Sequence, residues 1–409
     1  MTKITDIPAI RFKGFSDTWE QRKLNEVAEF NPKSELPDEF EYVDLESVVG
    51  TEMISHRTET KDSAPSRAQR LAQPGDVFFQ TVRPYQKNNY LFSKLDNNYV
   101  FSTGYAQMRP NIDTAFLMSF LQTDSFVKIV LDNCTGTSYP AINSSDLSNL
   151  EISLPKSFEE QKKVGKTIIS IDNLITLHQR KYDKLTNVKK SMLEKMFPQN
   201  GSNAPEIRFK GFTEAWEQRK LSEIATMHAR IGWQNLRTSE FLDSGDYMLI
   251  TGTDFIDGAV NFDTCHYVER ERYEQDKHIQ IRNGSILITK DGTLGKVAYI
   301  QGLTMPATLN AGVFNVEIKD ENEVDNRYLF QYLKAPFLMD YVDKKATGGT
   351  IKHLNQNILV DFPVVLPHKA EQEKIGEYFL AIDHLITLHQ RELEKLKNLK
   401  KACLEKMFV

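Results

Sequence analysis

One ten-residue segment, QTVRPYQKNN at residues 80–89, gathers side chains that can bond to the edges of planar bases. An Arg can donate two parallel hydrogen bonds to guanine, and Gln or Asn can bond to adenine in the same bidentate way. A Lys provides a point charge suited to phosphate. The candidate binding residues of this turn are Gln80, Arg83, Tyr85, Gln86, Lys87 and Asn88. The alternative interpretation is a solvated hairpin tip that binds nothing.

A second polar turn, TKDGTLGK at residues 289–296, carries Lys and Thr on a Gly-containing loop whose backbone can approach a phosphate closely. It is not a P-loop, because the Walker pattern needs a Gly five residues before the GK pair and Lys290 stands there. Its candidates are Lys290, Thr293 and Lys296. The aligned segments TGTSYPAIN (135–143) and TGGTIKHLN (347–355) add Ser138, Tyr139, Thr350, Lys352 and His353. The segment ARIGWQNLR adds Arg230, Trp233, Gln234 and Arg237, although Trp233 fits a hydrophobic core equally well.

Catalytic and metal-binding patterns are not found in this sequence. It has no Asn-Pro-Pro-aromatic or Asp-Pro-Pro-aromatic tetrapeptide for base methylation, no Gly-rich loop for S-adenosylmethionine and no helicase motif. The nine His residues show no HExxH or HxH spacing, and the three Cys never form a CxxC pair. An ExK triplet begins at Glu160, but its repeated copy begins with Gln372, and Ser157 with Glu160 has the spacing of a helix capping box. We expect a non-catalytic chain that holds no metal and no cofactor of its own.

The chain is built from two copies of one plan. IDNLITLHQR (171–180) returns as IDHLITLHQR (382–391), and the match extends over 157–197 and 368–408 at a constant offset of 211. IRFKGF begins each copy and LEKMF ends it, and PQNGSNAPE (198–206) between the copies has the composition of a linker. Between these motifs identity is lost, yet GDVFFQTVRPYQK aligns with GSILITKDGTLGK as a strand followed by a polar turn. The pattern indicates one scaffold with two different surfaces.

Each copy ends in a long predicted helix. Apolar positions from Val164 to Met196, and from Ile375 to Met407, alternate steps of four and three as in a heptad seam. A second apolar stripe, with Leu174 and Leu385, flanks the seam. Forty-one residues make a rod of ~60 Å, which is longer than one domain needs for its own core. We expect the two helices to pair and leave a second edge for a partner protein. Packing of each helix on its own domain is the alternative.

Composition and charge narrow the class of protein to which this chain can belong. With 409 residues, two to four domains of ~100 to 200 residues are expected. Hydrophobic residues make up 40% and charged residues 26%, and no run of 18 apolar residues could cross a bilayer. We therefore expect a cytoplasmic globular chain. The net charge of -5 argues against nucleic acid, but residues 57–94 carry seven Lys or Arg against three acids, a local excess of four positive charges.

This arrangement of repeated IRFKGF, LITLHQR and LEKMF motifs around two variable segments resembles the specificity subunits of type I restriction-modification systems. The resemblance covers essentially the whole chain. It implies an α+β fold in which two mixed target-recognition domains are joined by two long helices that form an antiparallel coiled coil, with a pseudo-twofold internal repeat. The expected segments are recognition domain 1 (1–156), helix 1 (157–197), a linker (198–206), recognition domain 2 (207–367) and helix 2 (368–409).

The same resemblance implies that each domain reads one half of a split DNA sequence, with the helices as a fixed spacer. Half-sites on one face of B-DNA lie ~34 Å or a little more apart. The implied partners are double-stranded DNA, methyltransferase (modification) subunits, two per chain, and restriction subunits, with no membrane. S-adenosylmethionine, ATP and Mg²⁺ would belong to those subunits. Two alternatives are a coiled-coil DNA-binding regulator and a protein-only adaptor, both unconnected with methylation.

Overall fold

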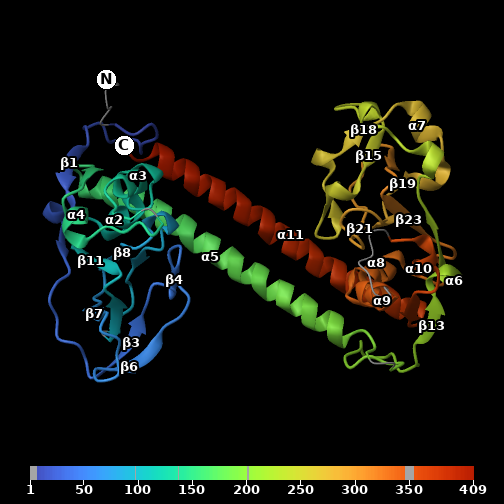
Figure 1. Cartoon of the computed structure of the whole chain (residues 1–409), viewed down its shortest axis with the longest axis horizontal. Helices are drawn as coiled ribbons and strands as arrows, with labels where there is room; N and C mark the ends of the chain where they lie inside the picture. The colour runs from blue at the N-terminus through green and yellow to red at the C-terminus, as the bar shows by residue number, and fades with distance from the viewer. Residues whose placement is uncertain (1–6, 97, 137, 200–201, 346–353) are drawn as a thin grey trace. The chain divides into compact units, whose positions relative to one another are not determined.

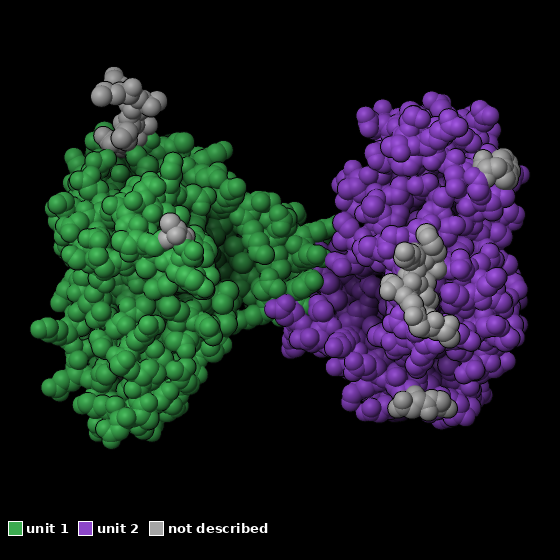
Figure 2. All heavy atoms as spheres, in the orientation of Figure 1, with its two compact units in different colours: residues 1–182, 388–409 green, residues 183–387 purple. Residues whose placement is uncertain are grey.

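The computed structural model describes residues 7–409 except 97, 137, 200–201 and 346–353. The chain divides into two compact units, one of residues 1–182 with 388–409 and one of residues 183–387 (Figure 2). Each unit contains one of the two expected recognition domains and a part of each long helix. These domains are called the first module (residues 1–156) and the second module (residues 207–367). Both boundaries between the units therefore fall inside helices.

The first module is built on two four-stranded sheets. Their strand orders are β2-β11-β8-β9 and β6-β3-β10-β7, and β10 runs parallel to β3 while the other pairings are antiparallel. The bounds are β2 (Ala28–Phe30), β3 (Glu39–Val43), β6 (Arg57–Thr60), β7 (Ala68–Leu71), β8 (Val77–Gln80), β9 (Tyr90–Leu91), β10 (Tyr99–Ser102) and β11 (Tyr105–Pro110). Shorter elements are α1 (Leu24–Val27), β4 (Val48–Val49), β5 (Glu52–Met53), η1 (Pro84–Gln86) and α4 (Ser144–Ser148).

The central strand β8 is buried on both faces. Val77 and Phe79 belong to the core formed with helices α2 (Thr114–Phe120) and α3 (Asp124–Asp132). Phe78 points the other way and stacks on Phe101 of the second sheet, with ring centroids 3.7 Å apart. Since alternate residues of a strand face opposite sides, an unbroken apolar run is what such a position requires.

The second module repeats this topology strand for strand. Its sheets have the orders β14-β23-β20-β21 and β18-β15-β22-β19, and β15 runs parallel to β22 as β3 does to β10. The bounds are β14 (Ala225–His228), β15 (Met248–Ile250), β18 (His266–Tyr267), β19 (Gln280–Ile281), β20 (Ile286–Thr289), β21 (Val297–Tyr299), β22 (Ala307–Leu309) and β23 (Val313–Ile318). Helices α8 (Asn326–Lys334) and α9 (Phe337–Lys345) take the places of α2 and α3.

Smaller elements complete both modules. A two-stranded sheet of β1 (Glu20–Lys23) and β12 (Glu151–Leu154) has its counterpart in β13 (Glu217–Lys220) and β24 (Pro363–Leu366). The second module also contains α6 (Leu221–Ile224), η2 (Gly232–Gln234), η3 (Thr238–Glu240), η4 (Gly252–Asp254), β16 (Phe255–Ile256), β17 (Ala259–Val260), η5 (Phe262–Thr264), α7 (Arg270–Glu274), η6 (Lys277–Ile279) and α10 (Gln356–Val360). The expected α+β fold with an internal repeat is confirmed.

The long helices are α5 (Phe158–Lys195) and α11 (Lys369–Lys406). Within each unit they lie side by side and antiparallel (Figure 1). In the first unit Lys400 Nζ lies 2.5 Å from Asp172 Oδ1, and in the second Lys189 Nζ lies 2.5 Å from Asp383 Oδ1. These two ion pairs are equivalent by the repeat. The predicted seam is buried where the helices leave the modules, at Val164, Ile168 and Ile171 and at Ile375, Phe379 and Ile382.

Each long helix ends in the core of a module. Met407 and Phe408, at the end of α11, pack with Trp19 and Phe116 of the first module. Met196 and Phe197, at the end of α5, are part of the core of the second module. The repeated LEKMF motif therefore serves as a plug at both helix ends.

The start of each helix is fixed to its module by a repeated ion pair. The Arg11 guanidinium donates two hydrogen bonds to Glu160, at 2.7 and 2.8 Å, and Arg208 does the same to Glu371. The expected capping role of Glu160 is replaced by this contact, because its buried carboxylate accepts from Arg11 instead of turning back on its own helix. The repeated IRFKGF motif thus supplies the cation for the helix start.

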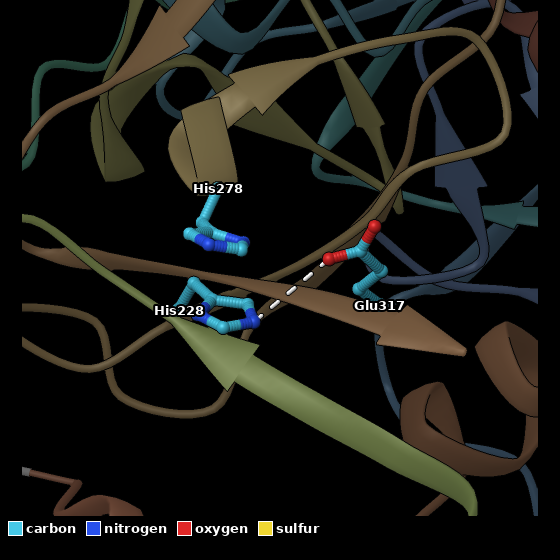
Figure 3. A group of neighbouring side chains, drawn as sticks. All are labelled: His228, His278 and Glu317. Carbon is cyan, nitrogen blue, oxygen red and sulfur yellow. Dashed lines mark ion pairs between the residues drawn. The ribbon is translucent and has the colours of Figure 1, made fainter. Parts of the chain in front are cut away.

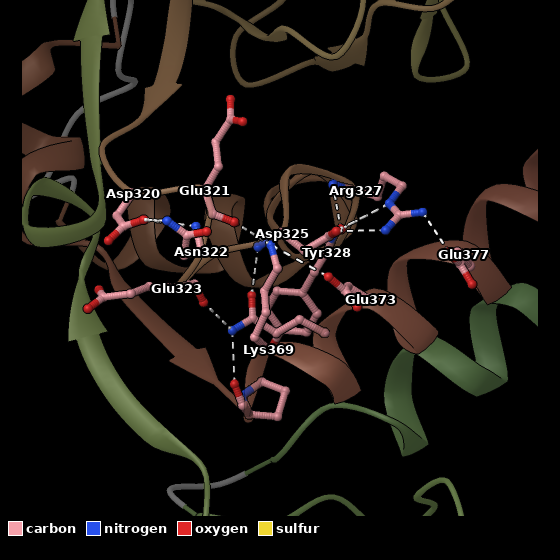
Figure 4. Close-up of polar contacts among 12 residues, drawn as sticks. Asp320, Glu321, Asn322, Glu323, Asp325, Arg327, Tyr328, Lys369, Glu373 and Glu377 are labelled. Atoms are coloured by element: carbon pink, nitrogen blue, oxygen red, sulfur yellow. Dashed lines mark hydrogen bonds and ion pairs between the residues drawn. The ribbon is translucent and has the colours of Figure 1, made fainter.

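A second tie joins the first turn of α11 to α8 (Figure 4). Asp325 caps α8 by accepting from the backbone N–H groups of Arg327 and Tyr328, both at 3.0 Å. Gln372 accepts from the backbone N–H of Asp325 at 2.9 Å and donates to the carbonyl of Glu323 at 3.0 Å. The equivalent Gln161 accepts from Asp113, which caps α2.

Glycines let the helices approach this closely. A Cβ on Gly165 would lie 2.3 Å from the Phe116 backbone nitrogen of α2. A Cβ on the equivalent Gly376 would lie 2.8 Å from the Tyr328 backbone nitrogen of α8. Both distances are shorter than any allowed contact, so these positions need Gly.

Candidate nucleic-acid interface

Two loops of the first module, which the sequence places far apart, meet beyond the end of β8. The backbone N–H of Arg83 donates to the Pro140 carbonyl at 2.8 Å, and that of Ile142 donates to the Thr81 carbonyl at 3.0 Å. A β-bridge joins Val82 and Ala141. The segments 80–89 and 135–143, both expected to carry binding residues, thus form one surface.

Arg83 and Tyr139 form the centre of this surface. Arg83 has a left-handed backbone with φ of 55°, and its guanidinium carbon lies 4.6 Å from the Tyr139 ring centroid. Tyr139 is 64% exposed, Tyr85 is 50% exposed, and Ser138 is also exposed. Stacking on a ring leaves the edge of a guanidinium available, so Arg83 can still offer its planar pair of donors.

Other residues of the turn hold it in place. The Lys87 ammonium donates to the Gln122 carbonyl at 2.9 Å. It also donates to the Asp124 carboxylate, and this second hydrogen bond lowers the pKa of Asp124. Gln80 is buried and donates to the Gln86 side chain at 2.9 Å. The Asn88 side chain accepts from the backbone N–H of Gly50 at 2.8 Å, whereas Gln86 is exposed. The polar groups of Gln80, Lys87 and Asn88 therefore form hydrogen bonds that hold the loop in place.

The second module builds the same junction from different residues. The backbone N–H of Lys290 donates to the Gly312 carbonyl at 2.9 Å, as that of Thr81 does to Gly104, and the N–H of Leu354 donates to the Lys290 carbonyl at 2.8 Å. The Lys296 and Thr293 side chains are exposed, and Lys290 is half-buried with its Nζ 5.4 Å from the Phe314 ring centroid. The candidates Thr350, Lys352 and His353 lie outside the described residues.

In the segment 229–237, two of the candidate binding residues, Arg230 and Gln234, are buried. Arg230 is 2% exposed and donates to the carbonyls of Leu309 and Arg272 at 2.6 and 3.0 Å and to the Gln275 side chain at 3.1 Å. Burial lowers the pKa of Arg230 to about 10. Gln234 is buried as well, Arg237 is exposed, and the Trp233 side chain lies outside what the structure describes. Arg230 and Gln234 thus serve the interior of the module in this structure.

Several of the Lys and Arg side chains in residues 57–94 interact with other groups of the first module. Arg57 pairs with Asp44 and Glu59, both at 2.8 Å. Lys94 donates to the Tyr99 hydroxyl at 2.6 Å, and burial lowers the pKa of Arg70. Counting charges in residues 57–94 does not reveal the pairing of Arg57 with Asp44, because Asp44 lies outside the counted window.

Among the described residues, no single helix is both long enough and apolar enough to cross a membrane. The pair of α2 and α3 would pass on length and composition together, but it is bent by 66°.

Two modules of one topology, each with a junction of paired loops and each tied to antiparallel helices, define a duplicated recognition protein. A family model for the type I restriction modification DNA specificity domain matches residues 16–187 and again 213–398. The chain belongs to this family and carries two copies of its domain. Its function is DNA target recognition, and specificity subunits of such systems are not themselves catalytic.

Similar proteins agree with this assignment. The type I restriction enzyme MjaVIII specificity subunit of Methanocaldococcus jannaschii is 25% identical over 297 residues, which cover 71% of this chain and 68% of the relative. The putative MjaX specificity subunit of the same organism is 26% identical and covers 64% of this chain and 59% of the relative. The crystal structure of a type I system S subunit from M. genitalium shares the fold, with a TM-score of 0.65 at 17% identity over 98% of this chain and 99% of that one.

Proposed function

We propose that the chain recognises a bipartite double-stranded DNA target, with one half-site read by each module, and directs methylation and restriction by partner subunits. The observation that carries this proposal is the repeated junction of two loops beyond β8 and beyond β20. The modules share two backbone hydrogen bonds at this junction but carry different side chains there, which is what two half-sites of different sequence require. The antiparallel pairing of α5 and α11 supports a fixed spacer between the half-sites.

In the first module we assign base reading to Arg83, with Tyr139 behind its guanidinium and with Tyr85, Gln86 and Ser138 around it. An Arg held against a ring loses less conformational freedom on binding a guanine than a free one, and its fork matches the two acceptors of that base. The ammonium of Lys87 and the amides of Gln80 and Asn88 then act by holding the loop.

In the second module we assign the contacts to Lys290, Thr293 and Lys296 of the loop after β20, and to Arg237. Thr350, Lys352 and His353 remain candidates from the sequence. A Lys ammonium suits phosphate rather than base edges, and of the two Lys residues Lys296 is the exposed one. Arg230 and Gln234 are left out because their buried polar groups already have partners inside the module.

The long helices are proposed to bind methyltransferase subunits, two per chain. Leu174 and Leu177 on α5 are 44% and 45% exposed, and the equivalent Leu385 and Leu388 on α11 are 44% and 42% exposed. Apolar side chains that recur on the repeat give two equivalent faces, and equal faces suit two copies of one partner.

S-adenosylmethionine, ATP and Mg²⁺ are assigned to the modification and restriction subunits and not to this chain. The protein would act in the cytoplasm, where its DNA lies. The family assignment does not favour the alternatives of a regulator or a protein-only adaptor unconnected with methylation.

Methylation-sensitive sequencing tests the proposal. A host that expresses the chain with its methyltransferase partner should show a methylated motif of two short sequences separated by a constant spacer. Replacing residues 226–363 with the same segment of a relative should change one half of that motif only. A contiguous motif, or a change in both halves, would contradict the division of labour between the modules.

A further inference from the structure

On the outer face of the second module, two histidines and a carboxylate converge from three segments of chain (Figure 3). His228 ends β14, Glu317 lies on β23, and His278 lies in η6. One ligand atom from each of these residues lies within 4.8 Å of the other two, and His228 Nε2 lies 3.8 Å from Glu317 Oε2. We propose that this triad binds a divalent transition-metal ion.

The strand pairing sets two of the three ligands. His228 lies opposite Asn315 and Thr226 lies opposite Glu317, so the side chains of His228 and Glu317 are diagonal neighbours on one face. The intervening Met227 and Val316 point into the core and anchor both strands. The two ligands thus come from rigid backbone, which keeps the entropy cost of assembling a site low.

The third ligand is fixed by backbone contacts. The Asn315 side chain donates to the His278 carbonyl at 2.9 Å, and the backbone N–H of His278 donates to the Asp276 carboxylate at 2.9 Å. The His228 and His278 rings stack with centroids 4.4 Å apart and planes 18° apart. A metal ion binds histidine through its ring nitrogens, and this stacking brings both rings to one place.

The geometry is open and needs only side-chain adjustment to close around an ion. Ligand atoms of a tetrahedral zinc site lie roughly 3.4 Å apart, given metal bonds of about 2.0 to 2.1 Å. His278 and Glu317 are exposed, so their rotamers can move over the remaining gap. The triad borders a cavity of about 710 Å³ that His278, Asn315 and Glu317 help to line, which leaves room for water as a further ligand.

The equivalent position of the first module holds an ion pair in place of the histidine and glutamate side chains. Arg109 takes the position of Glu317, since it lies opposite Glu29 of β2 as Glu317 lies opposite Thr226 of β14. Arg109 donates to Asp76 at 2.9 and 3.0 Å, which makes an ion pair across the sheet. In the second module Ser285 stands where Asp76 does, so this ion pair is replaced by an acid facing two imidazoles.

The ligand set selects the class of ion. Two imidazoles and one carboxylate suit Zn²⁺, Ni²⁺, Co²⁺ or Cu²⁺, whereas Mg²⁺ and Ca²⁺ prefer oxygen ligands alone. The ion would staple η6 to the sheet of β14 and β23. This inference departs from the expectation that the chain holds no metal, because three residues spread from 228 to 317 form no short motif.

Titration calorimetry with ZnCl₂ on the full-length chain without an affinity tag tests the inference. We expect one Zn²⁺ per chain and a higher melting temperature with zinc than with a chelator. His278→Ala and Glu317→Gln should each weaken binding by at least about tenfold, since loss of even an outer partner of a metal site costs that much. His266→Ala is the matched control, because His266 is an exposed histidine of the same module outside the triad.

Co²⁺ absorption identifies the ligands independently of affinity. Binding through nitrogen and oxygen gives d–d bands without the intense thiolate band that a cysteine ligand such as Cys265 would add. The inference is overturned if the unaltered chain binds no Zn²⁺, if both triad variants bind as the unaltered chain does, or if a thiolate band appears. It is also overturned if His266→Ala loses as much affinity as the triad variants.

Discussion

Arg83 offers the sharpest test of the proposed interface. Its guanidinium lies 4.6 Å from the Tyr139 ring centroid, and its backbone N–H is hydrogen-bonded to the Pro140 carbonyl. A bidentate bond to a guanine contributes roughly 1 to 3 kcal/mol of discrimination, or about 5-fold to 150-fold in affinity. Arg83→Ala should therefore remove the preference at one base of one half-site and leave the other positions unchanged.

The neighbouring ring sets a second, smaller magnitude. A cation over an exposed ring contributes about 0.5 to 1 kcal/mol, so Tyr139→Leu should cost about 2-fold to 5-fold, less than Arg83→Ala. Because Tyr139 acts through Arg83, the double variant should lose no more than Arg83→Ala alone. Arg83→Lys keeps the charge but not the fork, and should relax the same base without changing the salt dependence.

The assay is binding to duplexes that carry the methylated motif and each of its single-base variants, at two salt concentrations. Lys87→Ala is the comparison variant. If Lys87 only holds the loop that carries Arg83, through Gln122 and Asp124, its loss should lower the preference at the same base in part, and Asp124→Ala should do the same. A loss that is equal for every sequence and is not reproduced by Asp124→Ala would show that Lys87 contacts phosphate directly. Equal, sequence-blind losses for Arg83→Ala and Lys87→Ala would refute the assignment of Arg83.

Three further outcomes are expected. Gly165→Ala should destabilise the protein by about 1 to 3 kcal/mol or more, measured by denaturant unfolding, because its Cβ would lie 2.3 Å from a backbone nitrogen; an unchanged midpoint would contradict the close packing. Inserting one heptad after both Tyr182 and Leu393 should lengthen the spacer of the methylated motif and preserve its halves, and an unchanged spacer would rule out a ruler. Burial and the facing His178 hold the pKa of His389 below 6.5, so the unfolded chain binds a proton at a higher pH than the folded chain does. The free energy of unfolding should therefore fall as pH drops through 6.5 and level off below the lowered pKa of the folded chain. His389→Asn should remove this pH dependence from thermal melts.

The sequence could predict the long helices because a heptad is a local pattern. Ile168 and Ile382 are buried where the pattern places them. The ion pair of Arg11 with Glu160 was not predictable in the same way, since its partners are 149 residues apart and a capping box explains the same letters. Local spacing identifies an element, but the elements it meets depend on the complete fold.

The loops show the same limit at the level of single residues. Segments 80–89 and 135–143 could be chosen for their residue types, but nothing in either stretch indicates that Arg83 meets Tyr139. Arg230 has the residue type of a DNA contact, and its burial depends on the carbonyls of Leu309 in β22 and Arg272 in α7, which are distant in sequence and satisfy its donors. Residue type predicts what a side chain can bind, while topology decides whether it is free to do so.

The plug at the end of α11 has a consequence for how the chain is made. Phe408 completes an aromatic cluster with Trp19 and Phe116, so the first compact unit is assembled from both ends of the chain. The second unit is continuous from 183 to 387. A ribosome adds about 5 to 20 residues per second, so the first module must wait roughly ten to forty seconds after it emerges while the second is synthesised and free to fold. The half of the protein that is translated first is therefore the half that matures last.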